Sequence, residues 1–493
     1  MAQTELLPEV TKFIEAEPKM TIGGKATEAA SGETFEVIDP ATGKALTRVP
    51  RGGVEDIDKA VKVAREAFED RRWSGLRPGK RTEVLYKLGE LIKRNISELA
   101  QLESLDSGKP ISLASGEMWA AGEVLRYYSG WPTKTFGETN PSDDNVFVYS
   151  LREPVGVCGG IIPWNFPLIM AVWKVAPALA FGNTIVLKPA EQTPLTALRL
   201  GELCLEAGVP EGVVNVVTDY GTEAGQALAQ HYDVDKIAFT GSTEVGRKIL
   251  HASEGNLKRV TLELGGKSPN IVFSDANMKR ASRGTMNGVF LNSGQVCTAG
   301  TRILVEKSVH DDFLSTLVES TNAMKVGSPL DEDTAMGPVV SKEQFDRVNG
   351  YIDIGKSEGA EVVAGGGPAE GLGDGYFIQP TVFAGVRNDM QIAQEEIFGP
   401  VAAVIEVDDV DDAIRVANDT VYGLAAAVWT NDLTKAHRVA RGIKAGTVWV
   451  NTAGNVDPSV SFGGYKQSGF GRELGKHSLE TFTQTKSVWV NLK

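Results

Sequence analysis

The segment KIAFTGSTEVG, residues 236–246, decides the fold class of this chain. Residues 236–239 predict a buried strand, Gly241 predicts a tight turn, and the next helix has an apolar face of Val245, Ile249 and Ala252. The N-terminus of a helix that follows a glycine turn binds phosphate. The segment matches neither a Walker A loop nor a GxGxxG fingerprint, so it predicts a phosphate-binding turn without naming the nucleotide.

The same alternation of strand and helix continues on both sides of this segment. Two amphipathic helices are expected at 57–68 and 84–92. The expected strands are 184–187, 213–217, 236–239, 270–273, 303–306, 403–407, 425–429 and 447–450. Strands that alternate with helices predict βαβ units and parallel sheets, so the fold class is α/β. Because the strands fall into two groups, before and after about residue 262, we expect two doubly wound α/β domains.

Two further segments look like additions to a sheet. Apolar and polar residues alternate at 146–151 and at 488–492. Exposed strands of this kind pair with another strand, either within the chain or across a dimer.

The composition excludes several classes of protein. Apolar residues make up 42% of the 493 residues and charged residues 23%, which is ordinary for a globular protein and excludes a disordered chain. The formal net charge of −14 argues against binding of nucleic acid by the whole protein. The 54 glycines exceed the usual share of about 7% and indicate many tight turns or close backbone approaches.

Cysteine usage and hydropathy indicate a cytoplasmic protein. The three cysteines, Cys158, Cys204 and Cys297, are far apart and form no CxxC pair, so neither a disulfide framework nor a metal site is expected. No secretory signal is visible near the N-terminus. The apolar stretch 161–182 contains three prolines and a lysine, and its longest unbroken apolar piece is too short to span a membrane.

Cys297 is the candidate nucleophile. Small and polar residues flank it in 292–302, which indicates a turn, whereas Cys158 lies in an apolar strand and Cys204 on an apolar helix face. A buried, inert cysteine is the alternative interpretation. A nucleophilic cysteine needs a base, and none of the five histidines has a site-like context.

Glu263 is the candidate base. It stands between two leucines and before Gly265-Gly266, a costly place for a carboxylate unless it is used. A structural ion pair with Lys267 is the alternative. Asn165, in a stiff turn between Pro163 and Pro167, is a candidate oxyanion donor, or else the cap of the following helix.

Two charged segments indicate ligand binding. Lys188 and Glu191 follow an expected strand, where open α/β sheets bind ligands, and an acidic residue there hydrogen-bonds ribose hydroxyls and disfavours a 2′-phosphate. Glu395 and Glu396 precede an aromatic turn, and a solvated helix end is their alternative reading.

Together these motifs resemble the NAD(P)-dependent aldehyde dehydrogenase superfamily from about residue 20 to the C-terminus. The matching motifs, in order, are 163–167, 188–191, 239–246, 262–267, 294–297, 396–400 and 462–471. The resemblance implies that Cys297 adds to an aldehyde, that Asn165 and the Cys297 N–H hold the oxyanion, and that Glu263 activates the water that hydrolyses the thioester. It also implies a proton relay of Lys174 and Glu473.

The resemblance further implies NAD as cofactor, with NADP disfavoured by Glu191. The implied cofactor contacts are Ile162, Pro163, Trp164, Lys188, Glu191, Gly221, Gly225, Phe239, Thr240, Gly241, Ser242, Val245, Leu264, Gly265, Glu396 and Phe398. The implied substrate pocket is formed by Phe166, Met170, Trp173, Val296, Thr298, Val456 and Phe462, with Trp119 as a further candidate. These residues are largely apolar, so we expect a medium or large aliphatic or aromatic aldehyde.

The implied architecture has three parts. An NAD-binding domain covers 1–132 and 153–262, a catalytic domain covers 263–475, and an oligomerisation arm is formed by 133–152 and 476–493. The arm implies a homotetramer or homodimer. The sequence departs from the family pattern at Asp219, where glycine is common, at Ser461, where proline is common, and at Ser293, where glutamine is frequent.

Several other functions stay open at this point. A betaine aldehyde, aminoaldehyde or semialdehyde dehydrogenase would share the same motifs. A CoA-acylating relative would waste a water-activating Glu263, and a structural relative such as a crystallin need not retain Cys297, Glu263 and Asn165. A cofactor-free thiol hydrolase would not need the segments 188–191 and 239–246.

Overall fold

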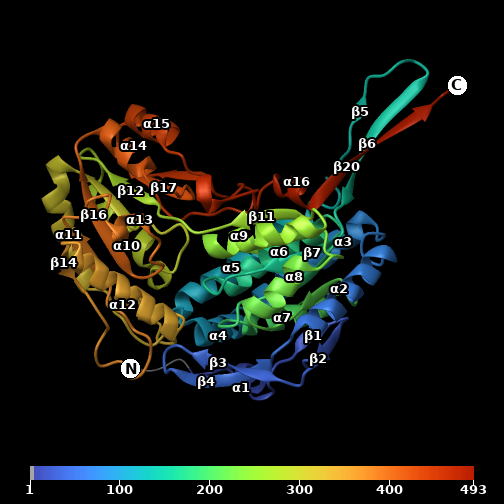
Figure 1. Ribbon diagram of the computed structural model, residues 1–493, viewed down its shortest axis with the longest axis horizontal. Helices are drawn as coiled ribbons and strands as arrows, with labels where there is room; N and C mark the ends of the chain where they lie inside the picture. Colours follow the sequence, from blue (N-terminus) through green and yellow to red (C-terminus); the bar gives the residue numbers. More distant parts are fainter. Residues whose placement is uncertain (1–4) are drawn as a thin grey trace.

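The structure is a computed structural model that describes residues 5–493. Figure 1 shows two large α/β units side by side, with a narrow strand arm that projects from one of them. Parallel sheets with helices on both faces confirm the predicted α/β class.

The first unit is built on an eight-stranded sheet. Its order is β19 (Gly469–Phe470), β11 (Arg259–Glu263), β10 (Lys236–Thr240), β7 (Val157–Ile161), β8 (Thr184–Lys188), β9 (Val214–Val216), β1 (Met20–Ile22) and β2 (Lys25–Thr27). The strands from β11 to β9 are parallel, and the outer ones pair antiparallel. The segment 236–246 therefore begins on a central strand, as its apolar character predicts.

Helices cover both faces of this sheet because side chains alternate along each strand. On one face, Ile185 and Leu187 pack against α3 (Pro78–Arg94), α4 (Ile96–Ser107), α5 (Ile111–Ser129), α6 (Pro167–Ala180) and α7 (Leu195–Ala207). On the other face, Val186 and Ile237 pack against α2 (Val54–Glu69), α8 (Gln226–Gln230) and α9 (Thr243–Ala252). The expected helices at 57–68 and 84–92 lie within α2 and α3. Helix α1 (Pro8–Glu15) and the hairpin of β3 (Thr34–Asp39) and β4 (Lys44–Pro50) complete this half.

The second unit is built on a seven-stranded sheet. Its order is β14 (Glu361–Ala364), β15 (Thr381–Ala384), β16 (Val401–Val407), β13 (Arg302–Glu306), β12 (Pro269–Val272), β17 (Ala425–Trp429) and β18 (Thr447–Val450). The helices α10 (Met278–Phe290) and α11 (His310–Asn322) pack on one face, and α12 (Lys342–Ser357), α13 (Gln391–Gln394), α14 (Val410–Asn418) and α15 (Leu433–Gly442) on the other. The two strands expected at 425–429 and 447–450 have the predicted bounds.

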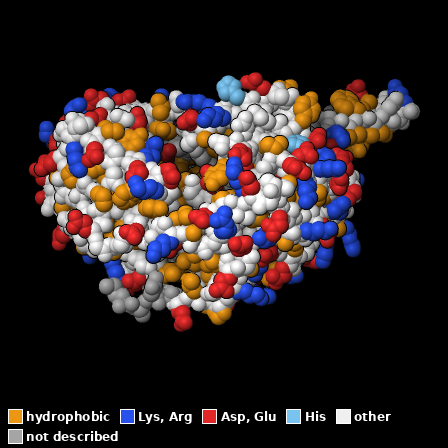
Figure 2. All heavy atoms as spheres, turned by 60° about the horizontal axis from the view of Figure 1, so that its bottom comes forward, with side chains coloured by type: hydrophobic (Ala, Val, Ile, Leu, Met, Phe, Trp, Pro, Cys, Tyr) orange, Lys and Arg blue, Asp and Glu red, His pale blue; other side chains and the backbone are white. Residues whose placement is uncertain are grey.

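The two alternating segments near 150 and 490 pair with each other. β6 (Val146–Pro154) and β20 (Thr483–Asn491) are antiparallel along their full length, β5 (Thr139–Asn140) adds a short edge, and α16 (Ser478–Phe482) leads into β20. Figure 2 shows hydrophobic side chains on this projecting arm. Among them, Trp489 is 72% exposed and Leu492 60%.

The chain returns from the second unit to the first before it enters the arm. β19 pairs with β11, with Glu263 opposite Gly469. The segment 463–473 is thereby brought against the end of the strand that carries Glu263. The rest of the surface in Figure 2 mixes acidic and basic side chains. Within residues 5–493, no helix combines the length and apolarity needed to cross a membrane.

Candidate active site

Cys297 lies in a tight loop after α10. Asn292, Ser293 and Gly294 follow one another with φ of 49°, 57° and 72°, which turns the chain away from the helix axis. A Cβ on Gly294 would lie 2.1 Å from the Gly399 carbonyl oxygen, so only glycine fits there. The turn leaves Cys297 partly exposed, whereas Cys158 and Cys204 are buried.

Hydrogen bonds join this loop to the turn that carries Asn165. Asn165 Nδ2 donates to the Gln295 carbonyl at 2.9 Å, and Asn292 Nδ2 donates to the Asn165 carbonyl at 2.8 Å. The Gln295 side chain accepts from Val340 N at 2.9 Å. Helix α6, which starts at Pro167, has no side-chain cap, so the alternative reading of Asn165 as its cap is wrong. The two predicted residues are thus held on one rigid loop pair.

The surroundings of Cys297 favour the neutral thiol. Burial, followed by the nearby carboxylates of Glu396 and Glu263, raises the pKa of Cys297 to about 12. Burial raises the pKa of Cys158 and Cys204 to about 12 as well. The three thiols therefore do not differ in pKa, and Cys297 differs from the other two by being partly exposed. A base must take the proton of Cys297 before it reacts.

Glu263 meets the requirements for that base. It ends β11, it is 4% exposed, and neither of its carboxylate oxygens has a hydrogen-bond partner within residues 5–493. Burial and then the Glu473 carboxylate raise the pKa of Glu263 well above its usual value, while Lys174 and Arg472 act against this rise. No ion pair with Lys267 is found among the described residues. An unpartnered buried carboxylate is costly and is typical of a site that binds something.

Lys174 and Glu473 form a buried ion pair beside Glu263. Lys174 projects from α6, pairs with Glu473, and donates to Thr240 Oγ1 at 2.6 Å. Phe462 N donates to the Glu473 carbonyl at 2.7 Å and holds that segment in place. The structure brings together the residues that the sequence assigns to the relay.

Lys188 and Glu191 lie at the carboxyl edge of the first sheet. Lys188 ends β8, and its Nζ pairs with Glu191 Oε2 at 3.1 Å. Ile162 N donates to the Lys188 carbonyl at 3.2 Å and connects this edge to the turn 162–165. Burial lowers the pKa of Lys188, and the Glu191 carboxylate opposes that effect.

The N-terminus of α9 lies on the same edge. Ser242 Oγ caps the helix by accepting from Val245 N at 3.2 Å, and Gly241 N donates to the Glu263 carbonyl at 3.0 Å. A Cβ on Gly246 would lie 2.6 Å from Leu264, so α9 packs closely on β11. The remaining N–H groups of the first turn have no partner inside the helix and suit a phosphate.

Glu396 and Phe398 lie across from this edge, on the second unit. Glu396 Oε1 accepts from Gly266 N at 2.9 Å, and burial raises the pKa of Glu396 to about 7. A Cβ on Gly265 would lie 2.1 Å from the other Glu396 oxygen. Phe398, with φ of 61°, has its ring 5.1 Å from that of Trp164. Glu395, by contrast, is exposed and accepts from Tyr351, so a solvated helix end describes Glu395 and not Glu396.

The carboxyl edge of the first sheet and the facing segment with Glu396 and Phe398 fit a dinucleotide. A lysine–carboxylate pair suits ribose hydroxyls, a free helix N-terminus suits a pyrophosphate, and a second carboxylate suits a further ribose. Phe239 and Leu264 are buried beneath the edge, and Pro163 and Thr240 are half-buried there. Gly221 and Gly225 bound a single π-helical turn after β9.

The predicted pocket residues differ in exposure. The rings of Trp173 and Phe462 are 5.4 Å apart, and Lys109 Nζ lies 4.6 Å from the Phe166 ring. Met170, Val296 and Thr298 are half-buried. Val456 is 51% exposed, and Trp119 is 55% exposed beneath Lys93.

Sequence reasoning did not assign roles to Asn292 and Gln295. Both side chains hold the Cys297 loop, and the Asn-Ser-Gly run 292–294 is a turn signal that could have identified the first of them. No local pattern marks Gln295, because its partner Val340 is distant in sequence.

Comparisons with known proteins place the chain among aldehyde dehydrogenases. The chain matches the aldehyde dehydrogenase family over residues 27–488. It is 50% identical over 472 residues to an aldehyde dehydrogenase of Aspergillus niger, with 96% of this chain and 94% of the relative covered. A solved NAD⁺ complex of an aldehyde dehydrogenase from Bacillus cereus superposes with a TM-score of 0.98 at 49% identity, over 100% of both chains. A solved indole-3-acetaldehyde dehydrogenase in complex with NAD⁺ has a TM-score of 0.95 at 46% identity, over 97% of both chains. The family match over residues 27–488 and the relative of 50% identity show that the chain belongs to the aldehyde dehydrogenase family.

Proposed function

We propose that this protein oxidises an aldehyde to the carboxylic acid with reduction of NAD. The observation that carries the proposal is Glu263, a buried carboxylate with two unpartnered oxygens that is close enough to Cys297 to raise its pKa. A thiol and a base at one site suit attack on a carbonyl carbon and later hydrolysis of a thioester.

Glu263 and the ion pair beside it act in two steps of this mechanism, and the other residues act in one each. Glu263, in its ionised form, accepts the Cys297 proton, directly or through water, and the sulfur adds to the aldehyde carbon to form a thiohemiacetal. The ion pair of Lys174 and Glu473 takes this proton from Glu263, which is then ionised for the second step. Asn165 Nδ2 and the Cys297 N–H donate to the developing oxyanion. Bound NAD supplies the acceptor for the hydride that leaves this carbon. The resulting thioester is hydrolysed by water that Glu263 deprotonates, and the ion pair of Lys174 and Glu473 carries the proton away.

The cofactor contacts are proposed from the geometry of the two edges. Lys188 and Glu191 hold the adenosine ribose, and a 2′-phosphate would meet the Glu191 carboxylate, so NAD is used in preference to NADP. The first turn of α9 faces the pyrophosphate. Glu396 and Phe398 position the nicotinamide ribose. The NAD⁺ complex of the Bacillus cereus relative supports this assignment.

The substrate is proposed to be a medium or large apolar aldehyde. The pocket residues Trp173, Phe462 and Met170 are apolar, and the exposed Val456 leaves room at the mouth. A relative of the same fold is named an indole-3-acetaldehyde dehydrogenase, which supports an aromatic substrate. Another relative of this fold, from Staphylococcus aureus, is named a betaine aldehyde dehydrogenase, so a cationic aldehyde is the second candidate.

The domain assignment and the assembly are proposals of the same kind. We assign residues 1–132 and 153–262 to the NAD-binding domain, 263–475 to the catalytic domain, and 133–152 with 476–493 to an oligomerisation arm. The exposed apolar side chains of the arm support a homodimer or homotetramer. Three free cysteines support a cytoplasmic location.

Two variants test the chemistry. Cys297→Ala should remove NADH production with every aldehyde in a panel of aliphatic, aromatic and cationic substrates. Glu263→Gln should slow the formation of the thioester and stop its hydrolysis, so NADH should form slowly to at most about one per site, because neither the thiol nor the water has its base. Substantial turnover by Cys297→Ala, or native steady-state turnover by Glu263→Gln, would contradict the assigned roles. The order of kcat/KM across the panel decides the substrate class.

A further inference from the structure

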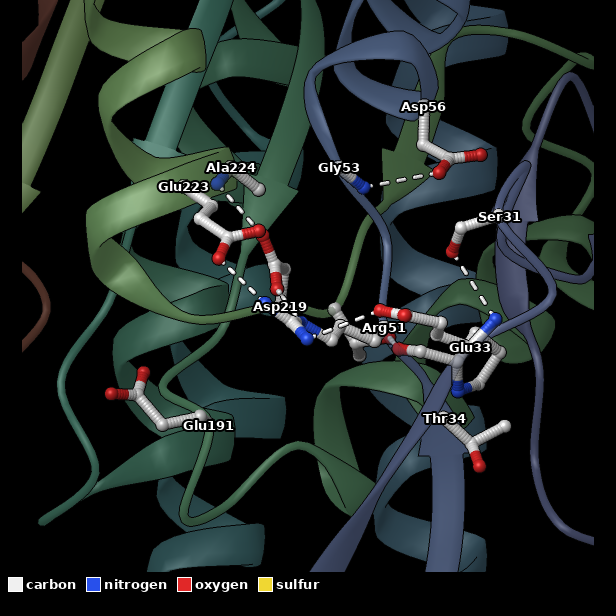
Figure 3. Close-up of polar contacts among 12 residues, drawn as sticks. Ser31, Glu33, Thr34, Arg51, Gly53, Asp56, Glu191, Asp219, Glu223 and Ala224 are labelled. Carbon is white, nitrogen blue, oxygen red and sulfur yellow. Dashed lines mark hydrogen bonds and ion pairs between the residues drawn. The ribbon is translucent and has the colours of Figure 1, made fainter.

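A second carboxylate lies at the edge that binds the adenosine ribose. Asp219 follows β9 as Glu191 follows β8, and the two strands are parallel neighbours with Leu187 opposite Val216. Val217 N donates to the Leu187 carbonyl at 3.0 Å, so the pairing continues to the strand ends. Both side chains therefore leave the sheet at its carboxyl edge, where ligands bind. Figure 3 shows them in one view.

Asp219 is buried but only half satisfied. Its side chain is 0% exposed, and Oδ2 accepts from Ala224 N at 2.9 Å. Oδ1 has no hydrogen-bond partner in the described part of the chain, and the Arg51 guanidinium nitrogen Nε is 3.9 Å from it. Burial raises the pKa of Asp219, and hydrogen bonds from the Tyr220 and Ala224 backbone, followed by the Lys188 ammonium, oppose the rise.

Arg51 is held by carboxylates on several sides. Its guanidinium pairs with Glu223 Oε1 at 2.6 Å and with Glu33 Oε2 at 3.1 Å, and it stacks over the Tyr220 ring at 5.4 Å. Figure 3 shows the guanidinium between these acidic groups. A free arginine at a ribose edge would attract a 2′-phosphate, because its planar fork binds phosphate bidentately. Here two of its nitrogens already donate to the carboxylates of Glu33 and Glu223.

We propose that Asp219 is a second cofactor-specificity determinant, which acts with Glu191 against the 2′-phosphate of NADP. The proposal rests on the proposed use of NAD at this same site. Asp219 acts in two ways: it adds a negative charge at the same sheet edge as Glu191, and together with Glu223 it competes with a phosphate for Arg51. Glycine, which is common at this position in the family, could do neither.

The test compares binding and turnover of the two cofactors. For Asp219→Asn, which keeps an oxygen for Ala224 N, we expect the ratio of NADP to NAD in kcat/KM to rise about tenfold, because one nearby charge is removed. The ratio of dissociation constants for NADPH and NADH, from fluorescence titration of the full chain, should move by the same factor. Asp58→Asn is the matched control, because Asp58 is an exposed carboxylate of α2 that pairs with His231 and not with Arg51.

Each result decides the proposal. An unchanged ratio in both measurements would overturn it, as would equal weakening of both cofactors, which is what a purely structural role of Asp219 predicts. If Asp219→Asn does not fold, the more exposed Glu223→Gln releases Arg51 from its closest partner and should move the ratio in the same direction. If the wild-type chain oxidised no aldehyde, the proposed function would fail, while the NADPH and NADH titrations would still decide the role of Asp219.

Discussion

Gly266→Ala perturbs the catalytic loop by a calculable amount. A Cβ on Gly266 would lie 2.4 Å from the carbonyl oxygen of Cys297, whereas ordinary contact begins at 3.4 Å. The Cys297 backbone must therefore move by about 1.0 Å. Leu424 Cβ lies 3.2 Å away on another side, so the new methyl group cannot turn aside. A displacement of about 1 Å at a reacting group costs about 10²-fold in rate.

The assay is kcat/KM for aldehyde at saturating NAD, beside the dissociation constant of NADH. We expect kcat/KM to fall about 10²-fold and stability to fall by about 1–3 kcal/mol from overpacking, with NADH binding less affected. Gly350→Ala is the control, since this glycine of α12 has nothing within 4 Å of a new Cβ. It should keep the native rate and gain about 0.5–1 kcal/mol of stability. A folded Gly266→Ala protein with native kcat/KM would refute the reasoning.

Two further measurements test the thiol and the arm. Because the pKa of Cys297 is raised to about 12, the rate of its alkylation by iodoacetamide in the cofactor-free protein should rise about tenfold per pH unit through pH 10. A rate that levels off near pH 9 would contradict the raised pKa. Cys297→Ala gives the background rate. Trp489→Asp, at an exposed position of β20, should lower the molar mass of the assembly in light scattering. Gln484→Asp on the same strand is the control and should leave that mass unchanged. Equal masses for both variants would exclude Trp489 from a subunit contact.

Local patterns predicted most of the fold. The strand at 425–429 and the helix at 84–92 follow from apolar periodicity, which depends only on neighbours in the chain. The expected strand at 270–273 begins one residue earlier, at Pro269, because pairing with Arg302 on β13 extends it. Strand ends depend on partners in the sheet and are poorly encoded locally.

The residues of the candidate site also divide into those that local patterns predict and those that depend on distant partners. Cys297, Glu263 and Asn165 were identified from their immediate neighbours, because a turn or a charge in an apolar run leaves a local signal. The residues that hold these groups in place were not identified in this way. Gln295 bonds to Val340, and Lys174 pairs with Glu473, 299 residues away. The sequence also marked Asp219 only as a departure from a pattern.

Periodicity was enough to predict the α/β class, because it depends on residue type and short spacing. The order of the motifs indicated the family by resemblance, and with it the proposed reacting groups. Packing alone decided which charges are buried together and which side chains hold the reacting groups in place. The environment of Glu263, for example, is set by Glu473, Lys174 and Arg472 on distant segments. Burial and the approach of distant charges set a pKa and an orientation, and both arise only when the two sheets, their helices and the returning segment 463–473 are assembled.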